Sequence, residues 1–391
     1  MRFFIKMTTA IIMLMCNQFN VYSNTRAKYP ISDHYNGVKF YNSYTTRDEE
    51  TNKKSSVKVM LSNISELLKW QTSTFLGLFK KNKVKVFNTD IPPQNVLDNS
   101  IRISFIGHLT FLIQTQGVNI LTDPVYSDRA SPVSFLGPKR YTLPGIKFEN
   151  LPRIDLILIS HNHYDHMDIK TLKKICKLYN PIIAVPLGNA KTIHSSIPYA
   201  RIVELDWWET FDMKNIDIHL VPAKHWSSRI LLDHNKSLWG SFIVESKPKN
   251  NSSKNIDIDK INNFNRIHAI NKKQTIQNPC VCVLGDTAYS QTMFKDISNK
   301  FQNIVLSIIP IGAYKPRWIM RKSHMSPYDA ALTHMDLKSK YSIPSHYNTF
   351  NLSQDSSIDQ INDFKISKQK YNIKNFEILD IGSSKIIRTN R

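Results

Sequence analysis

The chain has 391 residues, of which 52 are Lys or Arg and 31 are Asp or Glu, so its formal net charge is +21. Hydrophobic residues make up 41% and charged residues 21%, as in globular proteins, and the sequence has no glycine period, sustained heptad or second long apolar run. Collagen-like, coiled-coil and polytopic membrane proteins are therefore excluded. The positive charge favours anionic partners, although a Lys-, Asn- and Ile-rich composition explains it equally well.

The first residues have the features of a secretory signal. Residues 1–6 are basic, and residues 7–16 are apolar over a length too short to span a bilayer but sufficient for the core of a signal peptide. We therefore predict a signal peptide over residues 1–23 and an exported protein, periplasmic or secreted, that associates peripherally with a membrane. The alternative is a cytoplasmic, membrane-associated protein.

Residues 24–100 are predicted to form an N-terminal extension. Within it, apolar residues recur at helical spacing over 57–85, with Trp70 among them and a lysine cluster at the end. An amphipathic helix of this composition is typical of membrane interfaces, because apolar burial and attraction to headgroups add. A helix packed on the domain that follows explains the same pattern.

From residue 101 onward the pattern changes to short apolar runs, and we assign residues 101–391 to one domain. Helical spacing appears between the runs, as over 172–179. Many strands mixed with a few helices are typical of an α/β or α+β sandwich. Strands are expected at 101–106, 118–121, 154–159, 182–185, 216–221, 238–244, 280–284, 305–309 and 376–381.

Residues 246–278 interrupt this rhythm. The segment is rich in Asn, Lys and Ser, and it carries seven Lys or Arg residues against two Asp. It has no stable hydrophobic period that would bury one of its faces. We predict a basic, mobile surface insertion between two strands.

A cluster of metal-binding side chains directly follows the apolar run 154–159. His161, His163, Asp165 and His166 fall within six residues, and imidazole together with carboxylate suits zinc and related divalent metals. In an extended chain His161 and His163 face one way, toward one ion. Asp165 and His166 can serve a second ion where the chain turns toward the next helix. A solvated polar loop is the alternative.

Three later apolar runs each lead to one more residue of a ligand type. Taken singly, each has an ordinary explanation, as a packed aromatic ring, a turn former after a glycine or a surface residue. One loop, however, does not complete two metal sites, so further ligands must come from the rest of the chain. The residues that follow these runs are His225, Asp286 and His346.

Taken in order, these residues resemble the ligand pattern of the metallo-β-lactamase superfamily. Within that superfamily, the sequence is similar to the phospholipases D that hydrolyse N-acyl-phosphatidylethanolamine. The likeness covers about residues 100–350. The stretches that carry it are FIGH (105–108), LTDP (121–124), RASP (129–132), GPKR (137–140), ISHNHYDH (159–166), PAKHW (222–226), LWGS (238–241), GDTAY (285–289), IGAYKPRW (311–318) and TF (349–350).

The resemblance implies a four-layer αββα sandwich whose ligands come from loops at one edge of two sheets. It also implies two zinc ions, although manganese or iron can occupy similar ligand sets. Carried over position by position, the family pattern places three residues on each ion and one as a bridge: His161, His163 and His225 on the first, Asp165, His166 and His346 on the second, and Asp286 between them.

Three further residues are candidates for supporting roles. His324 matches a family position near the active site, so it is expected to orient the phosphate or to protonate the departing alkoxide. A histidine of the core or the surface is the alternative. His108 and Asp123 are expected to orient metal ligands, and each is equally compatible with a purely structural role.

The resemblance implies a phosphodiesterase that converts N-acyl-phosphatidylethanolamine into an N-acylethanolamine and phosphatidate by two-metal hydroxide attack. Its catalytic residues are expected to be Asp165, Asp286 and His324. The expected partner is an anionic phospholipid or membrane surface, with nucleic acid disfavoured, and a homodimer is implied by the resemblance alone. The alternatives are hydrolysis of another phosphodiester or of a sugar-phosphate lactone, and a non-catalytic binder of membranes or nucleic acid.

Overall fold

The computed structural model describes residues 28–44, 89–213, 215–230, 232–247 and 275–389. Three predicted features lie outside these residues: the signal peptide 1–23, the amphipathic helix 57–85 and most of the insertion 246–278. Among the described residues, no helix is both long enough and apolar enough to cross a membrane.

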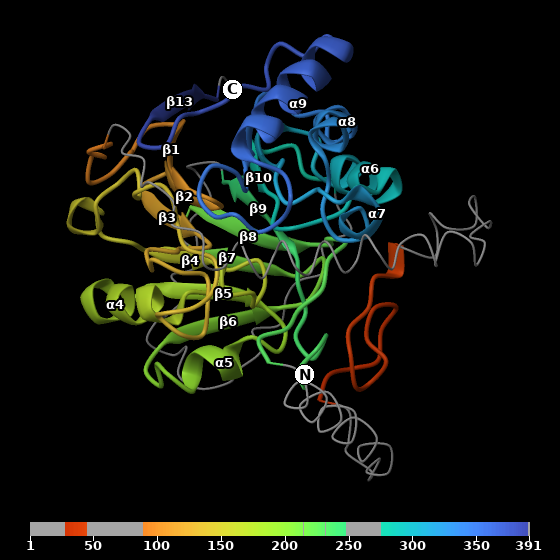
Figure 1. Ribbon diagram of the computed structural model, residues 1–391. Coiled ribbons are helices and arrows are strands. Elements are labelled where there is room, and N and C mark those ends of the chain that lie inside the picture. The colour runs from red at the N-terminus through yellow and green to blue at the C-terminus, as the bar shows by residue number, and fades with distance from the viewer. Residues whose placement is uncertain (1–27, 45–88, 214, 231, 248–274, 390–391) are drawn as a thin grey trace, which may run out of the picture.

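Two β-sheets lie face to face within the described residues (Figure 1). The first has seven strands in the order β13 (Ser384–Arg388), β1 (Ser100–Gly107), β2 (Thr110–Thr115), β3 (Val118–Thr122), β4 (Leu156–Leu158), β5 (Ile182–Pro186) and β6 (Arg201–Leu205). The second has six strands in the order β12 (Ser342–Ser345), β11 (Ile304–Pro310), β10 (Cys280–Val283), β9 (Ser241–Ser246), β8 (Ile216–Val221) and β7 (Thr210–Met213).

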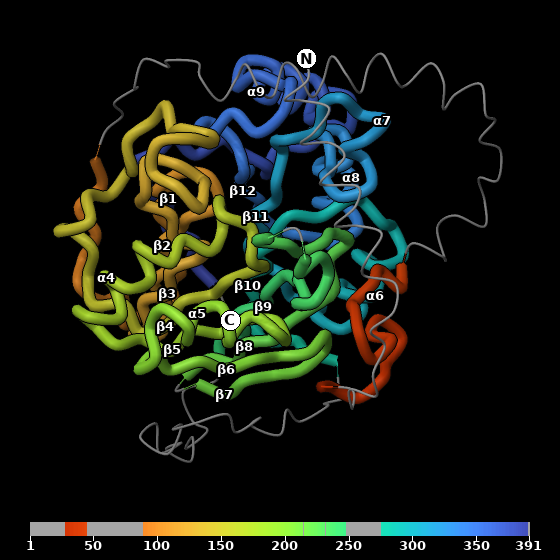
Figure 2. The backbone as a smooth tube through the Cα atoms, turned by 60° about the horizontal axis from the view of Figure 1, so that its bottom comes forward, coloured from red at the N-terminus to blue at the C-terminus, as the bar shows by residue number. Residues whose placement is uncertain are grey.

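Helices cover the outer faces of both sheets, which gives four layers (Figures 1 and 2). This arrangement confirms the predicted αββα sandwich. The helices on the first sheet are α4 (Ile169–Tyr179) and α5 (Ala190–His194), and those on the second are α6 (Gln291–Lys300), α8 (Pro327–Asp336) and α9 (Ser357–Lys370). A short helix, α7 (Arg317–Met320), and a 3-10 turn, η1 (Phe148–Asn150), lie in the connections.

Burial on both faces explains why several strands are apolar throughout. In β5, Ile182 and Ala184 face the core between the sheets, whereas Ile183 and Val185 face the core beneath α4 and α5. Such a strand is covered by the other sheet on one face and by helices on the other, so it needs apolar side chains on both faces. The continuous apolar runs in the sequence therefore become central strands.

The strand directions place four chain segments at one edge of the sandwich. In the first sheet, β3, β4, β5 and β6 are parallel, and in the second, β10, β11 and β12 are parallel. Strand β8 is antiparallel to β9, which is antiparallel to β10, so β8 and β10 point the same way. The segments after β4, β8, β10 and β12 carry all seven predicted metal ligands.

The start of α4 is fixed by a capping aspartate. Asp168 accepts hydrogen bonds from the backbone N–H groups of Lys170 at 3.1 Å and Thr171 at 3.3 Å, so it satisfies two of the free donors of the first turn. The helix buries Leu172 and Ile175 on one side. The chain between β4 and α4, residues 159–168, is hereafter the ligand loop, and both of its ends are anchored.

One predicted strand is wrong. Residues 376–381 form a single bridge, in which Phe376 pairs with Ser342, and they then leave the edge of β12. Phe376 and Ile381 are buried in the core, which explains the apolar pattern without an extended ladder. The C-terminal strand is instead β13, which has exposed side chains in alternation and pairs with β1.

Residues 28–44, hereafter the N-terminal strap, pack against the sandwich. Tyr35 and Phe40 are buried in the core that the two sheets share. His34 is held between two carboxylates, with Nε2 2.7 Å from Asp206 Oδ1 and Nδ1 2.7 Å from Asp33 Oδ1. Its ring stacks on Trp207 with centroids 4.3 Å apart. This part of the predicted extension is therefore joined to the domain.

The contacts of His34 with Asp33 and Asp206, hereafter the His34 latch, predict that the stability of the fold depends on pH. Burial lowers the pKa of His34, but the hydrogen bonds to Asp206 and Asp33 outweigh it, so the pKa lies above its ordinary value. A raised folded-state pKa stabilises the fold below the unfolded pKa, and this contribution is lost as pH rises through the folded pKa. His34→Gln should cost about 1–3 kcal/mol at pH 6 and clearly less at pH 9, measured by urea unfolding. An equal loss at both pH values would contradict a protonated latch.

Candidate metal centre

The ligand loop places its four predicted ligands in a buried space. His161 and His166 are 1% and 0% exposed, and Asp165 Oδ2 lies 3.3 Å from His166 Nε2. His163 points its Nδ1 at His161 Nε2, 2.8 Å away. The solvated loop that the sequence left as an alternative is wrong, because these side chains face inward.

The three ligands predicted from distant strands meet the loop at the same place. His225 Nε2 lies 3.3 Å from His163 Nδ1. Asp286 Oδ2 lies 3.3 Å from His166 Nε2, and His346 Nε2 lies 3.2 Å from Asp286 Oδ1. The donor atoms form groups that are compact enough to share an ion. These groups are His161, His163 and His225; His108, Asp165, His166 and His346; His161, His166 and Asp286; and His225, Asp286 and His324.

Hydrogen bonds behind the rings show which nitrogens face the centre. Ser160 Oγ donates to Asp123 Oδ2 at 2.6 Å, so it accepts from His161 Nδ1 at 2.9 Å. His225 Nδ1 donates to the carbonyl of Ser323 at 2.9 Å. In both rings the Nε2 atom is therefore a bare lone pair aimed at His163 Nδ1. Of the three nitrogens that meet here, only His163 Nδ1 can carry a proton. Three imidazole nitrogens with so few protons suit a divalent cation.

The second group of donors leads to the same conclusion. His166 Nδ1 lies 2.7 Å from Asp123 Oδ2, which directs its Nε2 toward the centre. The Nε2 atoms of His166 and His346 and the Oδ1 atom of Asp286 are buried without a hydrogen-bond partner. Buried polar atoms are almost always satisfied, so three such atoms at one point are arranged as a bound cation would require. The residues present therefore fit a divalent metal.

Both carboxylates of the centre carry negative charge. Burial raises the pKa of Asp165, but the charge of His166 and the hydrogen bond from His108 outweigh it, and the pKa lies well below its ordinary value. Burial likewise raises the pKa of Asp286, which the charges of His346 and His166 bring well below the usual range. Two ionised carboxylates among buried imidazoles provide the hard, anionic component of a metal site.

Asp123 and His108 lie directly behind the ligands. Asp123 accepts from the backbone N–H of Ser160 at 2.7 Å as well as contacting His166. His108 Nε2 lies 2.9 Å from Asp165 Oδ2. Both residues, and His346, have positive φ values, of 32° for Asp123, 59° for His108 and 60° for His346. Backbone strain of this kind is stored where a site requires an exact side-chain direction.

His324 lies at the side of the centre, next to Asp286 and His225. Its Nδ1 is 3.8 Å from Asp286 Oδ2, and its ring centroid is 5.0 Å from that of His225. The turn after α7 holds it, since its N–H donates to Met320 O at 2.7 Å. With 12% of its side chain exposed, it is more accessible than the ligands His225 and His346. The position suits a group that contacts a substrate.

Two glycines allow the four segments to approach closely. A Cβ on Gly285, just before Asp286, would lie 2.5 Å from Ser160 Cβ. A Cβ on Gly312 would lie 1.9 Å from the carbonyl oxygen of His346. Neither site has room for a side chain, because backbone or ligand-loop atoms occupy it.

Sequence reasoning missed the residue that braces the ligand loop from outside. Arg229 donates to the carbonyls of Asn162 at 2.8 Å and Met167 at 2.9 Å, and its guanidinium lies 4.0 Å from the centroid of the Tyr164 ring. The sequence offered only its position four residues after His225. Residues with this spacing lie on one face in a helix, but the segment is not helical, so the spacing does not predict a contact.

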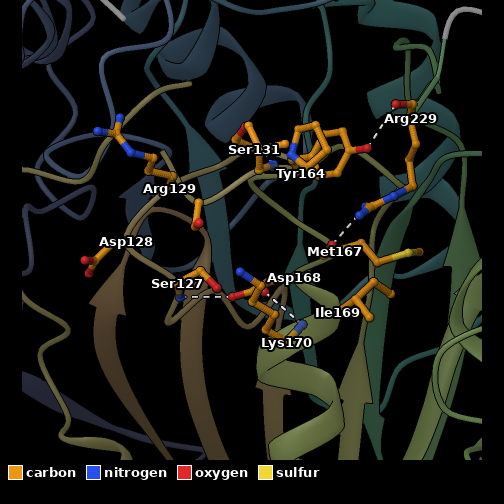
Figure 3. Close-up of a pocket in the computed structure, with 13 residues that line it drawn as sticks. Ser127, Asp128, Arg129, Ser131, Tyr164, Met167, Asp168, Ile169, Lys170 and Arg229 are labelled. Atoms are coloured by element: carbon orange, nitrogen blue, oxygen red, sulfur yellow. Dashed lines mark hydrogen bonds between the residues drawn. The ribbon is translucent and has the colours of Figure 1, made fainter. Parts of the chain in front are cut away.

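A pocket of about 330 Å³ opens beside the ligand loop (Figure 3). The loop contributes Tyr164, whose hydroxyl points at the backbone of Arg229 in the figure and donates to its carbonyl at 3.1 Å. Arg129, Lys170 and Arg229 line the pocket together with Asp128 and other polar side chains. The pocket thus has cationic and acidic groups beside the ligand loop, and none of the seven predicted ligands lines it.

Comparisons with known proteins identify the family of the domain that carries this site. A family model described as a beta-lactamase superfamily domain matches residues 118–252 and 274–347, a range that contains all seven predicted ligands. N-acyl-phosphatidylethanolamine-hydrolyzing phospholipase D 1 of Caenorhabditis elegans is 34% identical over 282 residues, which cover 68% of this chain and 70% of that protein.

Two further similarities show less, because one covers under half of the relative and the other has a low sequence identity. The mitochondrial N-acyl-phosphatidylethanolamine-hydrolyzing phospholipase D of Saccharomyces cerevisiae is 34% identical over 242 residues, or 61% of this chain and 45% of that protein. The solved structure of a metallo hydrolase from the archaeon Ignicoccus hospitalis matches with a TM-score of 0.50 at 17% identity, covering 74% of this chain and 100% of that one. The structural match concerns the fold alone.

The contacts of Asp123 predict a role in metal affinity. Asp123→Asn preserves the size of the side chain but presents an amide to two groups that donate to it, His166 and Ser160. We expect metal affinity to fall by about 10–100-fold, measured by zinc competition with a chromophoric chelator. Asp128→Asn, the same change at an exposed position, should bind zinc as the wild type does. Unchanged affinity in Asp123→Asn would show that Asp123 does not orient the ligands.

Proposed function

The chain belongs to the metallo-β-lactamase superfamily and is a metal-dependent hydrolase, and we propose that it cleaves N-acyl-phosphatidylethanolamine as a two-metal phospholipase D. The observation that carries the proposal is the convergence of seven donor side chains from four segments at one edge of the sandwich. The nematode and yeast relatives, named for hydrolysing this lipid, supply the substrate class.

The proposed ligand arrangement follows the directions of the donor atoms. The lone pairs of His161, His163 and His225 would hold one metal, since His163 Nδ1 lies 2.8 Å from His161 Nε2 and 3.3 Å from His225 Nε2. Asp165, His166 and His346 would hold the other metal, and Asp286 lies between the two groups. Zinc is the metal we propose. A metal pair of this kind supplies an acidified water as the nucleophile and positive charge for the phosphate oxygens.

The residues of this chain then position the reaction. Hydrolysis breaks the bond between phosphorus and the ethanolamine oxygen, while the oxygen of water joins phosphorus and a proton passes to the departing oxygen. His324, beside Asp286 and open to solvent at one side, is placed to orient a phosphate oxygen or to deliver that proton. Asp165 and Asp286 act as catalytic residues by placing the metals.

The surroundings of the centre support a lipid substrate. The pocket beside the ligand loop is lined by three cationic side chains, Arg129, Lys170 and Arg229, against two acidic ones, Asp128 and Asp168, and this excess of positive charge suits an anionic headgroup. Nearby segments expose apolar side chains, with Phe135 78% and Leu232 61% exposed, and such residues suit contact with acyl chains. The net charge of +21 further supports an anionic phospholipid surface as the partner.

The substrate assignment predicts a specific product. The full chain, incubated with N-acyl-phosphatidylethanolamine in detergent micelles, should release N-acylethanolamine and phosphatidate. Removal of metal by a chelator, or the change Asp165→Asn, should abolish the release, which mass spectrometry can follow. Two bound metals without lipid cleavage would reject this substrate and favour another phosphodiester or a sugar-phosphate lactone. Full turnover in Asp165→Asn would reject the ligand assignment.

The position of His324 predicts a defect in turnover without loss of metal. In His324→Gln we expect kcat to fall by about 10²–10⁴-fold while the metal content stays that of the wild type. Lys322→Gln, an exposed neighbour, should retain full activity. If His324→Gln loses metal in parallel with activity, His324 is a ligand and its proposed part in proton transfer is wrong.

A further inference from the structure

The N-terminal strap reaches the metal centre through one side chain. Asn42 Nδ2 donates to the carbonyl of His225 at 2.9 Å, and the N–H of His225 donates to Asn42 Oδ1 at 3.2 Å. A single amide side chain therefore satisfies both polar backbone groups of a predicted ligand. The two residues are separated by 183 positions in the sequence.

A buried tryptophan fixes the direction of this amide. Trp239 Nε1 lies 3.1 Å from Asn42 Oδ1 and 2.8 Å from the carbonyl of Ala223. The indole N–H is only a donor, so it requires the oxygen of Asn42 on its side. The opposite orientation of the amide would place donor against donor at His225 and at Trp239. Asn42 is thus held in the one orientation that matches the backbone of His225.

The strap is anchored on both sides of Asn42. Before it, the N–H of Phe40 donates to Asn235 O at 2.8 Å, and the His34 latch holds the strap to Asp206. After it, the hydroxyl of Tyr44 donates to Asp296 of α6 at 3.1 Å. Figure 2 shows the strap, in red, beside α6. Asn42 is therefore a fixed part of the fold.

His225 has its remaining support on the opposite side. Its ring is oriented by the carbonyl of Ser323, and its backbone has Asn42 as the described partner of both N–H and C=O. Three residues separate the end of β8, at Val221, from His225. The ladder of β8 thus does not hold this backbone. Thr287 and Ala288 hold the preceding residue, Lys224, and the strap holds His225 itself.

We propose that Asn42 is a positioning residue for the metal ligand His225. The strap, which lies outside the residues matched by the family model, then sets the affinity of the metal held by His161, His163 and His225. The proposal rests on the metal centre of the proposed function but not on its substrate. Ligand-orienting groups of this kind change metal affinity about 10–100-fold.

The test measures zinc affinity of the full chain by competition with a chromophoric chelator. In Asn42→Ala we expect one of the two zinc affinities to fall about 10–100-fold and the other to stay within about twofold of the wild type. Cobalt substitution should give an altered visible spectrum for the weakened site. These readouts report on ligand geometry and do not depend on catalysis.

The matched control is Asn36→Ala in the same strap. Asn36 Oδ1 accepts from the N–H groups of Val38 at 3.0 Å and Lys39 at 2.8 Å, and these bonds stay within the strap. This variant should lose stability in the metal-free state but keep both zinc affinities. If Asn36→Ala and Asn42→Ala weaken zinc binding equally, Asn42 is merely structural and the proposal is wrong.

A second variant keeps the test decisive if Asn42→Ala folds poorly. Trp239→Phe removes the N–H that orients Asn42 and should weaken the same zinc affinity by a smaller factor. In the double variant the part of the Trp239→Phe effect that acts through Asn42 Oδ1 is already lost, so zinc affinity should fall by less than the product of the two single effects. Wild-type zinc affinity in Trp239→Phe and Asn42→Ala would overturn the proposal. A wild-type chain that binds no zinc would instead overturn the metal centre of the proposed function.

Discussion

The structure depends on holding a group of buried metal-binding atoms close together at one edge of the sandwich. His161 Nε2 and His225 Nε2 both present lone pairs to His163 Nδ1, and three more buried atoms nearby have no hydrogen-bond partner. Such a group would spread apart in a flexible chain, since unsatisfied polar atoms in a low dielectric are costly. Hydrogen bonds on the outer sides of the rings of His161, His166 and His225 prevent this. The rest of the fold keeps those outer contacts in place, and a divalent cation stabilises the arrangement.

The sandwich provides this rigidity through strand direction and close packing. Ligand-bearing segments leave β4, β8, β10 and β12 at one edge, so residues far apart in sequence converge. Gly285 and Gly312 let backbone segments approach at distances that any side chain would prevent. The positive φ values of His108, Asp123 and His346 show strain confined to the same edge. Because many buried apolar contacts surround these positions, the fold tolerates the strain.

Function in this chain is distributed over more than the motif residues. The ligand loop is closed at one end by the cap of α4 and braced outside by Arg229, while the N-terminal strap reaches His225 through Asn42. A pocket with basic side chains adjoins the loop, next to segments that expose apolar residues. Chemistry common to the superfamily is therefore set in surroundings that suit an anionic, amphiphilic substrate, the class that we propose.

Local pattern was sufficient for part of this picture. Apolar runs such as 182–185 determined central strands, because a strand buried on both faces has no polar position, and the four ligands of 161–166 were legible because one loop holds them. The run 376–381 misled, since burial of Phe376 and Ile381 produces a strand pattern without a ladder. The tertiary structure alone decided which nitrogen each ring presents and what holds it. The contacts of Ser323 and Asn42 with His225 join residues 98 and 183 positions apart, and hydrogen bonds over such separations leave no periodic trace in a sequence.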